Sequence, residues 1–420
     1  MRHTVVVVGA GQAGLSISRV LTDRGIEHVV FERGRIAESW RSARWDSFTL
    51  VTPNWMTRLP GKSYDGPDAD GFMAREAFVG WLEDYAREAN LPVRCGVEVQ
   101  HAEPLGNGFA LSTSAGRIEC DNVVIATATY QTPAVPPVAA ALPADLLQVH
   151  AAQYRNPAQL PQGAVLVVGS GQSGCQIADE LRRHGRKVYL ATGRAGRLLR
   201  RYRGRDGIAW QHAMGLLDRT PDMLESLALR HRGDPHLTGA GGGRTLNLHR
   251  FAEDGMVLLG RLEAVEGRTL RFGSDLRANL AFADDYAAEF CAKIDSFITG
   301  SGIDAPPAAA TNSDFGGPLR AEPASDPRTI DIDVAGIACV VWGTGFKYDF
   351  TWIDVPGGLD EFGYPIQRRG IGSVPGLFYL GLNWLHKRKS GIVFGVGEDA
   401  EFLAHAIAER VATPRSDLGS

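Results

Sequence analysis

The 420-residue sequence has few cysteines, and their spacing excludes several classes of protein. It contains five, an odd number, and no two of them form a CxxC or CxxxxC pair. Disulfide scaffolds and zinc sites need paired or clustered cysteines, so neither is expected. We interpret the five residues as small hydrophobic side chains in a protein of the reducing cytosol. They are Cys95, Cys120, Cys175, Cys291 and Cys339.

Long hydrophobic runs and an excess of charge are also absent. No apolar stretch approaches the roughly 18 residues that cross a bilayer, and the N-terminal run of valines is too short for a secretory signal. The formal net charge of -4 favours neither nucleic acid nor an anionic membrane. With 44% hydrophobic and 22% charged residues, the composition is that of an ordinary globular protein. We therefore expect a cytoplasmic protein without nucleic-acid or membrane partners.

Two glycine turns of the same pattern are the most informative feature that is present. Each follows a short apolar run and precedes a helical pattern, as in dinucleotide-binding units. The first glycine permits a sharp turn, the second lets the backbone approach a pyrophosphate, and the third allows close packing of helix on strand. Two turns predict two dinucleotides, with electrons passing between them. The first turn contains Gly9, Gly11, Gln12, Ala13 and Gly14, and the second contains Gly169, Gly171, Gln172, Ser173 and Gly174.

The end of the following strand distinguishes the two turns. Glu32 ends that strand after the first turn, where an acid accepts hydrogen bonds from a ribose diol and repels a 2′-phosphate. Thr192 holds the corresponding position after the second turn. Arginines follow it, and a guanidinium binds phosphate well. The first site is predicted to bind FAD and the second NADPH in preference to NADH, with Arg194 best placed for the phosphate. Arg197, Arg200 and Arg201 also follow, and a solvated basic loop explains Arg200 and Arg201 equally well.

The repeated unit and the linkers predict an α/β protein with two Rossmann-like domains, the second inserted into the first. Proline-rich residues 131–163 and residues 304–330 are the predicted linkers. The periodicity predicts strands at 4–8, 28–32, 336–342 and 377–381, and helices at 12–24, 75–89, 279–300 and 398–411. The predicted boundaries are 1–160 and 320–420 for the first domain and 161–319 for the second, with a helical and loop insertion at about 200–300.

Four further segments carry a family resemblance. They are residues 33–41, ending in Glu38-Ser39-Trp40-Arg41; residues 44–48 with Thr52-Pro53-Asn54; residues 125–130; and residues 381–397. With the two glycine turns, these segments resemble class B flavoprotein monooxygenases, which include flavin-containing, N-hydroxylating and Baeyer–Villiger enzymes. The resemblance runs over most of the chain and is strongest to a bacterial subgroup of short flavoproteins. It implies a fold and the cofactors FAD and NADPH, but no substrate.

Two positions depart from the family pattern. Ala128 replaces the usual glycine of an ATG motif, and we expect only a slight adjustment of the backbone. The family's FxGxxxH pattern keeps only its histidine, His150, which disfavours a Baeyer–Villiger enzyme and fits the flavin-containing or N-hydroxylating branch better. A hydrogen-bonded linker residue is an equally good interpretation of His150.

The resemblance also implies a reaction. NADPH would reduce FAD, and a C4a-peroxyflavin formed with O2 would transfer one oxygen atom to a small substrate with a nucleophilic nitrogen, sulfur or carbon. One alternative is an FAD-dependent NADPH reductase that passes electrons to a partner protein or a quinone. Another is a flavin-binding sensor, although a sensor needs only one nucleotide. A flavin–disulfide reductase is disfavoured because no two cysteines are neighbours. The oligomeric state is left open, a homodimer being one option.

Individual residues receive roles from the same resemblance. Asn54 is the predicted catalytic residue, beside the reactive edge of the flavin, and an Asx turn after Pro53 is the alternative interpretation. The basic residues 386–389 either add positive charge near the flavin, hold an anionic substrate, or form a solvated turn. Besides the turn residues and Glu32, the predicted FAD ligands are Arg33, Trp40, Arg41, Ala126, Thr127 and Asn383, and no metal is predicted.

Overall fold

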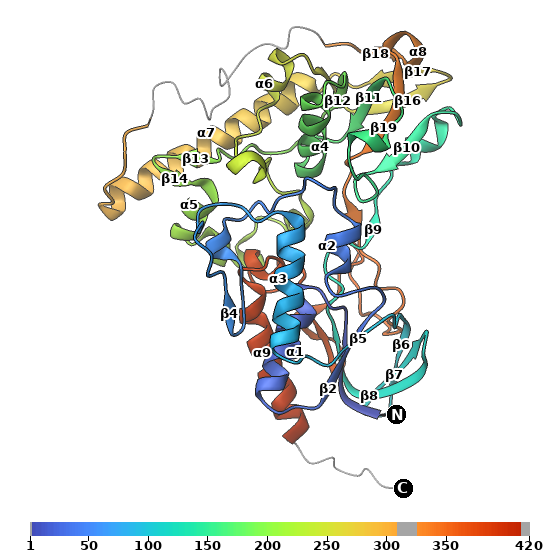
Figure 1. Ribbon diagram of the computed structural model, residues 1–420, viewed down its shortest axis with the longest axis vertical. Coiled ribbons are helices and arrows are strands. Elements are labelled where there is room, and N and C mark those ends of the chain that lie inside the picture. The colour runs from blue at the N-terminus through green and yellow to red at the C-terminus, as the bar shows by residue number, and fades with distance from the viewer. Residues whose placement is uncertain (1, 309–325, 413–420) are drawn as a thin grey trace.

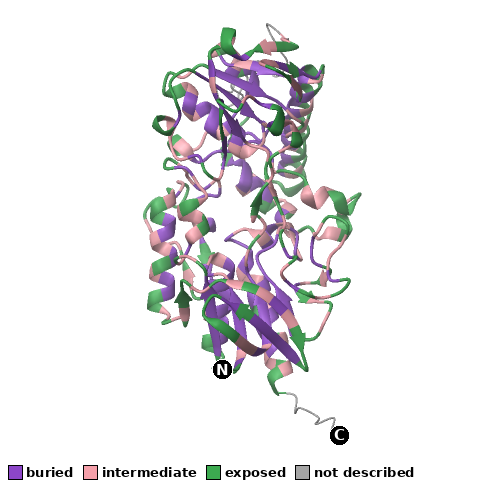
Figure 2. Cartoon of the chain, turned by 90° about the vertical axis from the view of Figure 1, so that its right-hand side faces the viewer, coloured by how far each residue is buried: buried purple, intermediate pink, exposed green. Residues whose placement is uncertain are grey.

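The apolar runs of the sequence form the central strands of two parallel sheets, each in its own α/β unit. The computed structural model describes residues 2–308 and 326–412. Figure 1 shows the two units stacked along the long axis of the molecule, and Figure 2 shows buried residues at the centre of each. The predicted fold class, two Rossmann-like units with the second inserted in the first, is confirmed.

The first unit is built on a sheet with the order β21-β22-β23-β8-β1-β2-β5. Its five strands from β23 to β5 run parallel, and a β6–β7 hairpin extends it from β8. The strands are β1 (Arg2–Val8), β2 (His28–Glu32), β5 (Val93–Cys95), β6 (Val99–Leu105), β7 (Gly108–Thr113), β8 (Gly116–Ile125), β21 (Gln367–Arg368), β22 (Ile371–Gly372) and β23 (Leu377–Tyr379).

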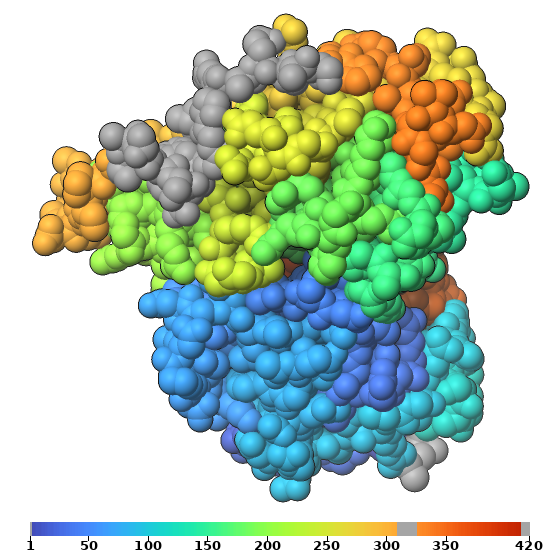
Figure 3. All heavy atoms as spheres, turned by 45° about the horizontal axis from the view of Figure 1, so that its top comes forward, coloured from blue at the N-terminus to red at the C-terminus, as the bar shows by residue number. Residues whose placement is uncertain are grey.

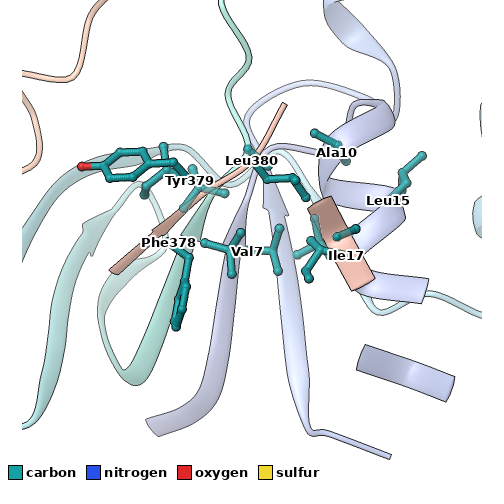
Figure 4. Close-up of a cluster of buried hydrophobic side chains, with 14 of the residues drawn as sticks. Val7, Ala10, Leu15, Ile17, Phe378, Tyr379 and Leu380 are labelled. Carbon is teal, nitrogen blue, oxygen red and sulfur yellow. The ribbon is translucent and has the colours of Figure 1, made fainter. Parts of the chain in front are cut away.

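Three helices cover this sheet: α1 (Gln12–Asp23), α3 (Arg75–Glu88) and α9 (Val396–Ala412). Val7 of β1, Ile17 of α1 and Leu380 after β23 are at most 1% exposed and lie in one core, shown in Figure 4. A strand that is covered on both faces needs apolar residues at every position, which explains the uninterrupted run of valines in β1. The N-terminal and C-terminal parts of the chain therefore share one core.

The second unit has a fully parallel sheet with the order β10-β19-β11-β12-β15. Its helices are α4 (Gln172–Arg183), α5 (Gly207–Ala213), α6 (Leu248–Glu253) and the long α7 (Leu276–Ser301). A separate antiparallel sheet is formed by β16 (Leu262–Glu266), β17 (Thr269–Phe272) and β18 (Thr329–Asp331). The strands of the parallel sheet are β10 (Leu147–His150), β11 (Ala164–Val168), β12 (Val188–Ala191), β15 (Val257–Leu259) and β19 (Ile337–Trp342).

Two strands correct the domain boundaries predicted from the sequence. β10 precedes residue 161 and β19 follows residue 319, yet both belong to the second sheet. The prediction placed them in the first domain because an apolar strand does not itself specify its sheet. The predicted linker 131–163 contains β10, and the predicted linker 304–330 lies largely outside the described residues.

The chain passes between the units at a short antiparallel ribbon. Its strands are β9 (Thr132–Pro133) and β20 (Phe346–Lys347), with Pro133 paired to Phe346. Figure 3 shows the blue N-terminal part of the first unit in contact with the green and yellow parts of the second along one seam. The remaining short elements are α2 (Glu38–Ser42), β3 (Arg58–Leu59), β4 (Lys62–Ser63), β13 (Arg201–Tyr202), β14 (Arg205–Asp206) and α8 (Ile332–Ala335).

Residues 198–303 cover the segment that carries Asn54. Met56, in the 3-10 helix Asn54–Met56, lies in an apolar cluster with Leu217, Trp210 and Phe394. This cluster joins the insertion to the first unit. None of the described helices has the length and apolarity needed to cross a membrane.

Candidate functional site

The two glycine turns have nearly identical backbones. The first glycine of each lies at a φ that L side chains rarely adopt, +105° at Gly9 and +103° at Gly169. A Cβ added to Gly14 would lie 1.8 Å from the carbonyl oxygen of Gly9, and one added to Gly174 would lie 1.8 Å from that of Gly169. The protein's own backbone therefore requires these four glycines.

The middle glycines differ, because nothing in the protein requires them. A Cβ on Gly11 or Gly171 would meet no heavy atom within 4 Å. Each of these glycines is the N-cap of its helix, α1 or α4, and neither helix has a side-chain cap. The first amides of both helices are thus open to a ligand, and a hollow lies where a side chain would stand. This arrangement fits a diphosphate, which binds helix N-termini through those amides.

The first turn opens into a cavity of about 430 Å3. Its walls include nine predicted ligands: Gly9, Gly11, Gln12, Ala13, Glu32, Arg33, Trp40, Ala126 and Thr127. Another group of wall residues was not predicted, and it comes from the β5–β6 connection with the start of β6, the segment after β8 and the segment after β20. These residues are Val97, Glu98, Val99, Gln100, Tyr130, Gln131, Asp349 and Trp352. Tyr130 and Gln131 follow the end of β8 at the same sheet edge as the glycine turn, which is the signal that could have found these two.

Glu32 is held at the rim of this cavity by two backbone amides. Its Oε2 accepts a hydrogen bond of 2.8 Å from the amide of Ala10, and its Oε1 accepts one of 2.9 Å from the amide of Gly34. Glu32 is only 9% exposed. The carboxylate is therefore fixed as predicted for an acid that orients a ribose diol.

The second turn has no acid at the corresponding place. Thr192 is buried and turns inward, donating to the carbonyl of Leu259 at 2.7 Å and accepting from Asn279 at 3.2 Å. Ser170 holds the loop instead, because its hydroxyl accepts from the amide of Gly193 at 3.0 Å. Arg194 is exposed and forms no hydrogen bond or ion pair with another described residue. Its guanidinium is thus available at the rim of the second site.

The other arginines of this segment have structural roles. Arg197 pairs with Asp284 at 2.8 Å, and Arg200 donates to Asp206 at 2.6 Å; both arginines are at most 1% exposed. Arg200 also donates to the carbonyl of Val51 in the first unit at 2.9 Å. The interpretations of Arg197 and Arg200 as phosphate ligands or as a solvated loop are therefore wrong.

Two predicted residues of the first site contact other parts of the protein. Arg41 pairs with Glu83 of α3 and does not line the cavity, so its predicted contact with FAD finds no support in the geometry. Asn383 also lies outside the cavity wall. The backbone amide of Asn383 donates to the hydroxyl of Thr129 at 3.0 Å, and its backbone carbonyl accepts from the hydroxyl of Tyr364 at 3.1 Å. These bonds hold the segment after β23 against the segment after β8.

Asn54 is 5% exposed, and its side-chain amide forms one hydrogen bond within the protein. Its Nδ2 donates to the carbonyl of Asp68 at 2.8 Å, whereas its Oδ1 is buried without a partner among the described residues. No Asx-type cap forms at the start of its 3-10 helix. The predicted catalytic role of Asn54 remains a prediction.

Ala128 and His150 lie at the two places where the sequence departs from the family pattern. Ala128 has a φ of +62°, the left-handed conformation that glycine favours. The backbone therefore has a conformation suited to glycine, and the Cβ of Ala128 makes it strained. His150 shares a hydrogen bond of 3.0 Å with the carbonyl of Gly345 and accepts one of 3.1 Å from the amide of Ala152. It is a hydrogen-bonded structural residue, as one of its two interpretations expected.

The basic run 387–389 connects the two units. Lys387 and Lys389 pair with Asp218 of the insertion at 2.9 Å each and also with Glu398 of α9. Arg388 pairs with Asp234 at 2.5 Å. The run is therefore neither a solvated turn nor a set of free charges for a substrate.

The segment with Asp234 continues to the second glycine turn. Gln172 donates to the carbonyl of Pro235 at 3.2 Å, and Nε2 of His236 donates to the carbonyl of Ser170. Burial lowers the pKa of His236 to about 4, which keeps the imidazole neutral. The Arg388–Asp234 pair thus joins the first unit to the segment that contacts the second turn.

Comparisons with known proteins agree with this geometry. Residues 6–202 match the family described as pyridine nucleotide-disulphide oxidoreductase. The chain is 32% identical over 411 residues to the "uncharacterized oxidoreductase CzcO-like" of Geobacillus kaustophilus (strain HTA426), covering 97% of this chain and 99% of the relative. It is 29% identical over 196 residues to indole-3-pyruvate monooxygenase YUCCA1 of Oryza sativa subsp. japonica, covering 44% of this chain and 47% of the relative.

A solved structure has the same fold. The flavin-containing monooxygenase from Stenotrophomonas maltophilia superposes with a TM-score of 0.64 at 17% identity, covering 98% of this chain and 99% of that one. The predicted resemblance to class B flavoprotein monooxygenases is therefore confirmed. The full-length similarity at 32% identity shows that the chain belongs to the family of the CzcO-like oxidoreductases.

Proposed function

We propose that the chain is an NADPH-dependent FAD monooxygenase that inserts one oxygen atom from O2 into a small nucleophilic substrate. One observation carries this proposal: the chain has two glycine turns of nearly identical backbone, each a cradle for a diphosphate, and only the first has an acid at its rim. The first cradle suits FAD with its free ribose, and the second suits NADPH with its 2′-phosphate. Monooxygenases among the relatives and structural neighbours support this choice of reaction.

The residues of each cradle have separate tasks. The open amides at the N-termini of α1 and α4 bind the diphosphates, Glu32 orients the ribose of FAD, and Arg194 contacts the 2′-phosphate of NADPH. When bound, NADPH supplies a hydride and FAD passes electrons on to oxygen. The cluster around Trp210 and Leu217 covers the Asn54 segment and excludes water from this side of it.

The proposal is tested by separating the two half-reactions. The purified yellow protein is reduced anaerobically with NADPH and then mixed with oxygen while its absorbance is followed. A monooxygenase shows rapid reduction and then a long-lived transient that is neither reduced nor oxidised flavin. Failure of NADPH to reduce the flavin would refute the assignment of both cofactors.

Asn54→Ala tests the predicted catalytic residue. We expect the oxygen-reactive state to decay several-fold faster, with more hydrogen peroxide released per NADPH oxidised, because the side chain would no longer support that state. Anaerobic reduction by NADPH should keep its rate. Thermal unfolding checks that loss of the bond to the carbonyl of Asp68 has not disordered the loop. An unchanged peroxide yield would remove Asn54 from the mechanism.

The alternative is an FAD-dependent NADPH reductase that delivers electrons to a partner protein or a quinone. One observation favours it: Nδ2 of Asn54 already donates one of its two N–H groups to the carbonyl of Asp68, which leaves at most one for an oxygen intermediate. A reductase would reoxidise quickly in the same experiment without the transient.

A further inference from the structure

Arg44 has an unusual environment beside the first cofactor cavity, next to two residues that line it. It lies in the loop between α2 and the Asn54 segment, and its guanidinium carbon is within cation–π distance of three aromatic rings. The distances to the ring centroids are 5.3 Å for Trp40, 5.6 Å for Phe48 and 5.7 Å for Tyr130. These rings leave the guanidinium little freedom to move.

No carboxylate among the described residues pairs with this guanidinium. Its one side-chain hydrogen bond runs to the carbonyl of the preceding residue, Ala43, at 2.7 Å. The buried Arg197 and Arg200, in contrast, each have an aspartate within 2.8 Å. Desolvation lowers the pKa of Arg44, as expected for a cation without a negative neighbour. The positive charge of Arg44 is therefore uncompensated by the protein around it.

The backbone of Arg44 is fixed by both units of the molecule. Its carbonyl oxygen accepts a hydrogen bond of 2.9 Å from Arg75 of α3 and one of 3.2 Å from Arg155 of the second unit. The backbone of Arg44 is thus held where the two units meet, by hydrogen bonds within the protein.

The guanidinium is also next to the first cofactor cavity. Trp40 and Tyr130, two of its three aromatic neighbours, line that cavity, and the indole of Trp40 donates to Gln12 of the first glycine turn at 3.1 Å. Tyr130 is 48% exposed, so the aromatic group borders open space. An uncompensated cation beside a cavity with a diphosphate cradle calls for an anionic ligand.

We propose that Arg44 is a binding residue for the diphosphate of a bound dinucleotide. The inference rests on the proposed function, since it assumes that dinucleotides occupy the cradles. The planar fork of a guanidinium matches two phosphate oxygens, and the three rings hold the fork in place before the ligand arrives. FAD and NADPH share this chemistry, and the experiment distinguishes them.

The test uses Arg44→Met, which keeps the length of the side chain, and Arg44→Lys, which keeps the charge. The affinity of the apoprotein for FAD is measured by quenching of flavin fluorescence. The affinity of the FAD-loaded protein for NADP+ is measured by the change in flavin absorbance. We expect Arg44→Met to weaken one of these affinities about tenfold or more, with a smaller dependence on salt, and Arg44→Lys to restore part of the loss.

The matched control is Arg117→Met, because Arg117 lies in β8, is exposed, and pairs with Glu103. It should leave both affinities within twofold of the parent protein. A loss confined to FAD assigns Arg44 to the FAD diphosphate, and a loss confined to NADP+ assigns it to NADPH. If Arg44→Met folds normally by circular dichroism and keeps both affinities within twofold, the proposal is overturned. Neither measurement needs turnover, so a failure of the proposed reaction is seen separately.

Discussion

The two glycine turns share a backbone but are anchored by different chemistry. The carbonyl of Ala10 in the first turn accepts from the backbone amide of Ala37 at 3.0 Å, whereas the carbonyl of Ser170 in the second accepts from the imidazole of His236. Glu32 ties the first turn to the next loop, and the hydroxyl of Ser170 does so in the second. The backbone of a dinucleotide cradle is thus dictated by glycines, while the side chains at its rim are free to set the ligand.

The largest effects should come from the third glycine of each turn. Gly14→Ala and Gly174→Ala each place a methyl group 1.8 Å from a backbone oxygen, which only a shift of the helix can relieve. We expect Gly14→Ala to abolish retention of FAD. Gly174→Ala should stay yellow but lose reduction by NADPH, while chemical reduction by dithionite still bleaches it.

Matched controls exist in both units. Gly80 in α3 and Gly300 in α7 are helical, and a Cβ at either would meet no atom within 4 Å. Gly80→Ala and Gly300→Ala should keep cofactor binding and be neutral or slightly stabilising. If Gly174→Ala is still reduced by NADPH at the parent rate, the equivalence of the two turns is lost.

Acid should lower the folding stability of the protein through His236, which contacts the second turn. The pKa of His236 is about 4 in the folded protein and about 6.5 in the unfolded chain, so the unfolded chain binds an extra proton between these pH values. The stability that this neutral imidazole contributes is complete above pH ~6.5 and is lost as the pH falls toward ~4, by on the order of 3 kcal/mol. Urea unfolding between pH 4 and 7 measures it.

His236→Gln provides the control, because it keeps a donor for the carbonyl of Ser170 but does not titrate in this range. Its stability should fall less steeply with pH than that of the parent protein. Affinity for NADP+ should also fall with acid more than affinity for FAD does. Equal slopes in parent and variant would show that His236 does not govern the acid sensitivity.

Arg194→Ala should change the choice of nucleotide. The exposed guanidinium has no partner among the described residues, and a phosphate contact of this kind is worth roughly 1.5 kcal/mol or more. We expect the KM for NADPH to rise about tenfold while that for NADH stays within twofold. Arg250→Ala, at an exposed arginine of α6, serves as the control. Equal increases for both nucleotides would contradict the assignment.

The smallest effect concerns strain beside the first cradle. Ala128→Gly removes a Cβ from a left-handed residue with a φ of +62°. The gain in the folded state is partly offset by the greater freedom of glycine in the unfolded chain, so we expect stabilisation of about 0.5–1 kcal/mol. Thermal unfolding of the FAD-loaded protein measures it, and destabilisation would show that the methyl group packs favourably.

Much of the fold was predictable because local patterns specify it. The strand His28–Glu32 has its predicted bounds, and the helices Arg75–Glu88 and Leu276–Ser301 lie within three residues of theirs. The sheet that β19 joins was not predictable, because an apolar strand fits either sheet. A parallel neighbour from a distant part of the chain makes that choice.

The candidate site shows the same division. Glycines and Glu32 were found because a short spacing relates them. The roles of Arg197, Arg200 and the basic run were not, because their partners Asp284, Asp206 and Asp218 meet them only in the folded chain. The sequence alone does not distinguish an arginine or lysine that binds a ligand from one that forms an ion pair with an acid of the same chain. Trp352 was likewise missed as a wall of the first cavity, since its segment returns from the second unit.

The β9–β20 ribbon has a consequence for how such proteins can diversify. Since Pro133 and Phe346 pair side by side, the segment between them begins and ends at one place on the first unit. Such a segment can be exchanged as a block between relatives, with both splice points at adjacent residues. Hybrid proteins joined there would combine one parent's flavin chemistry with another's choice of electron donor.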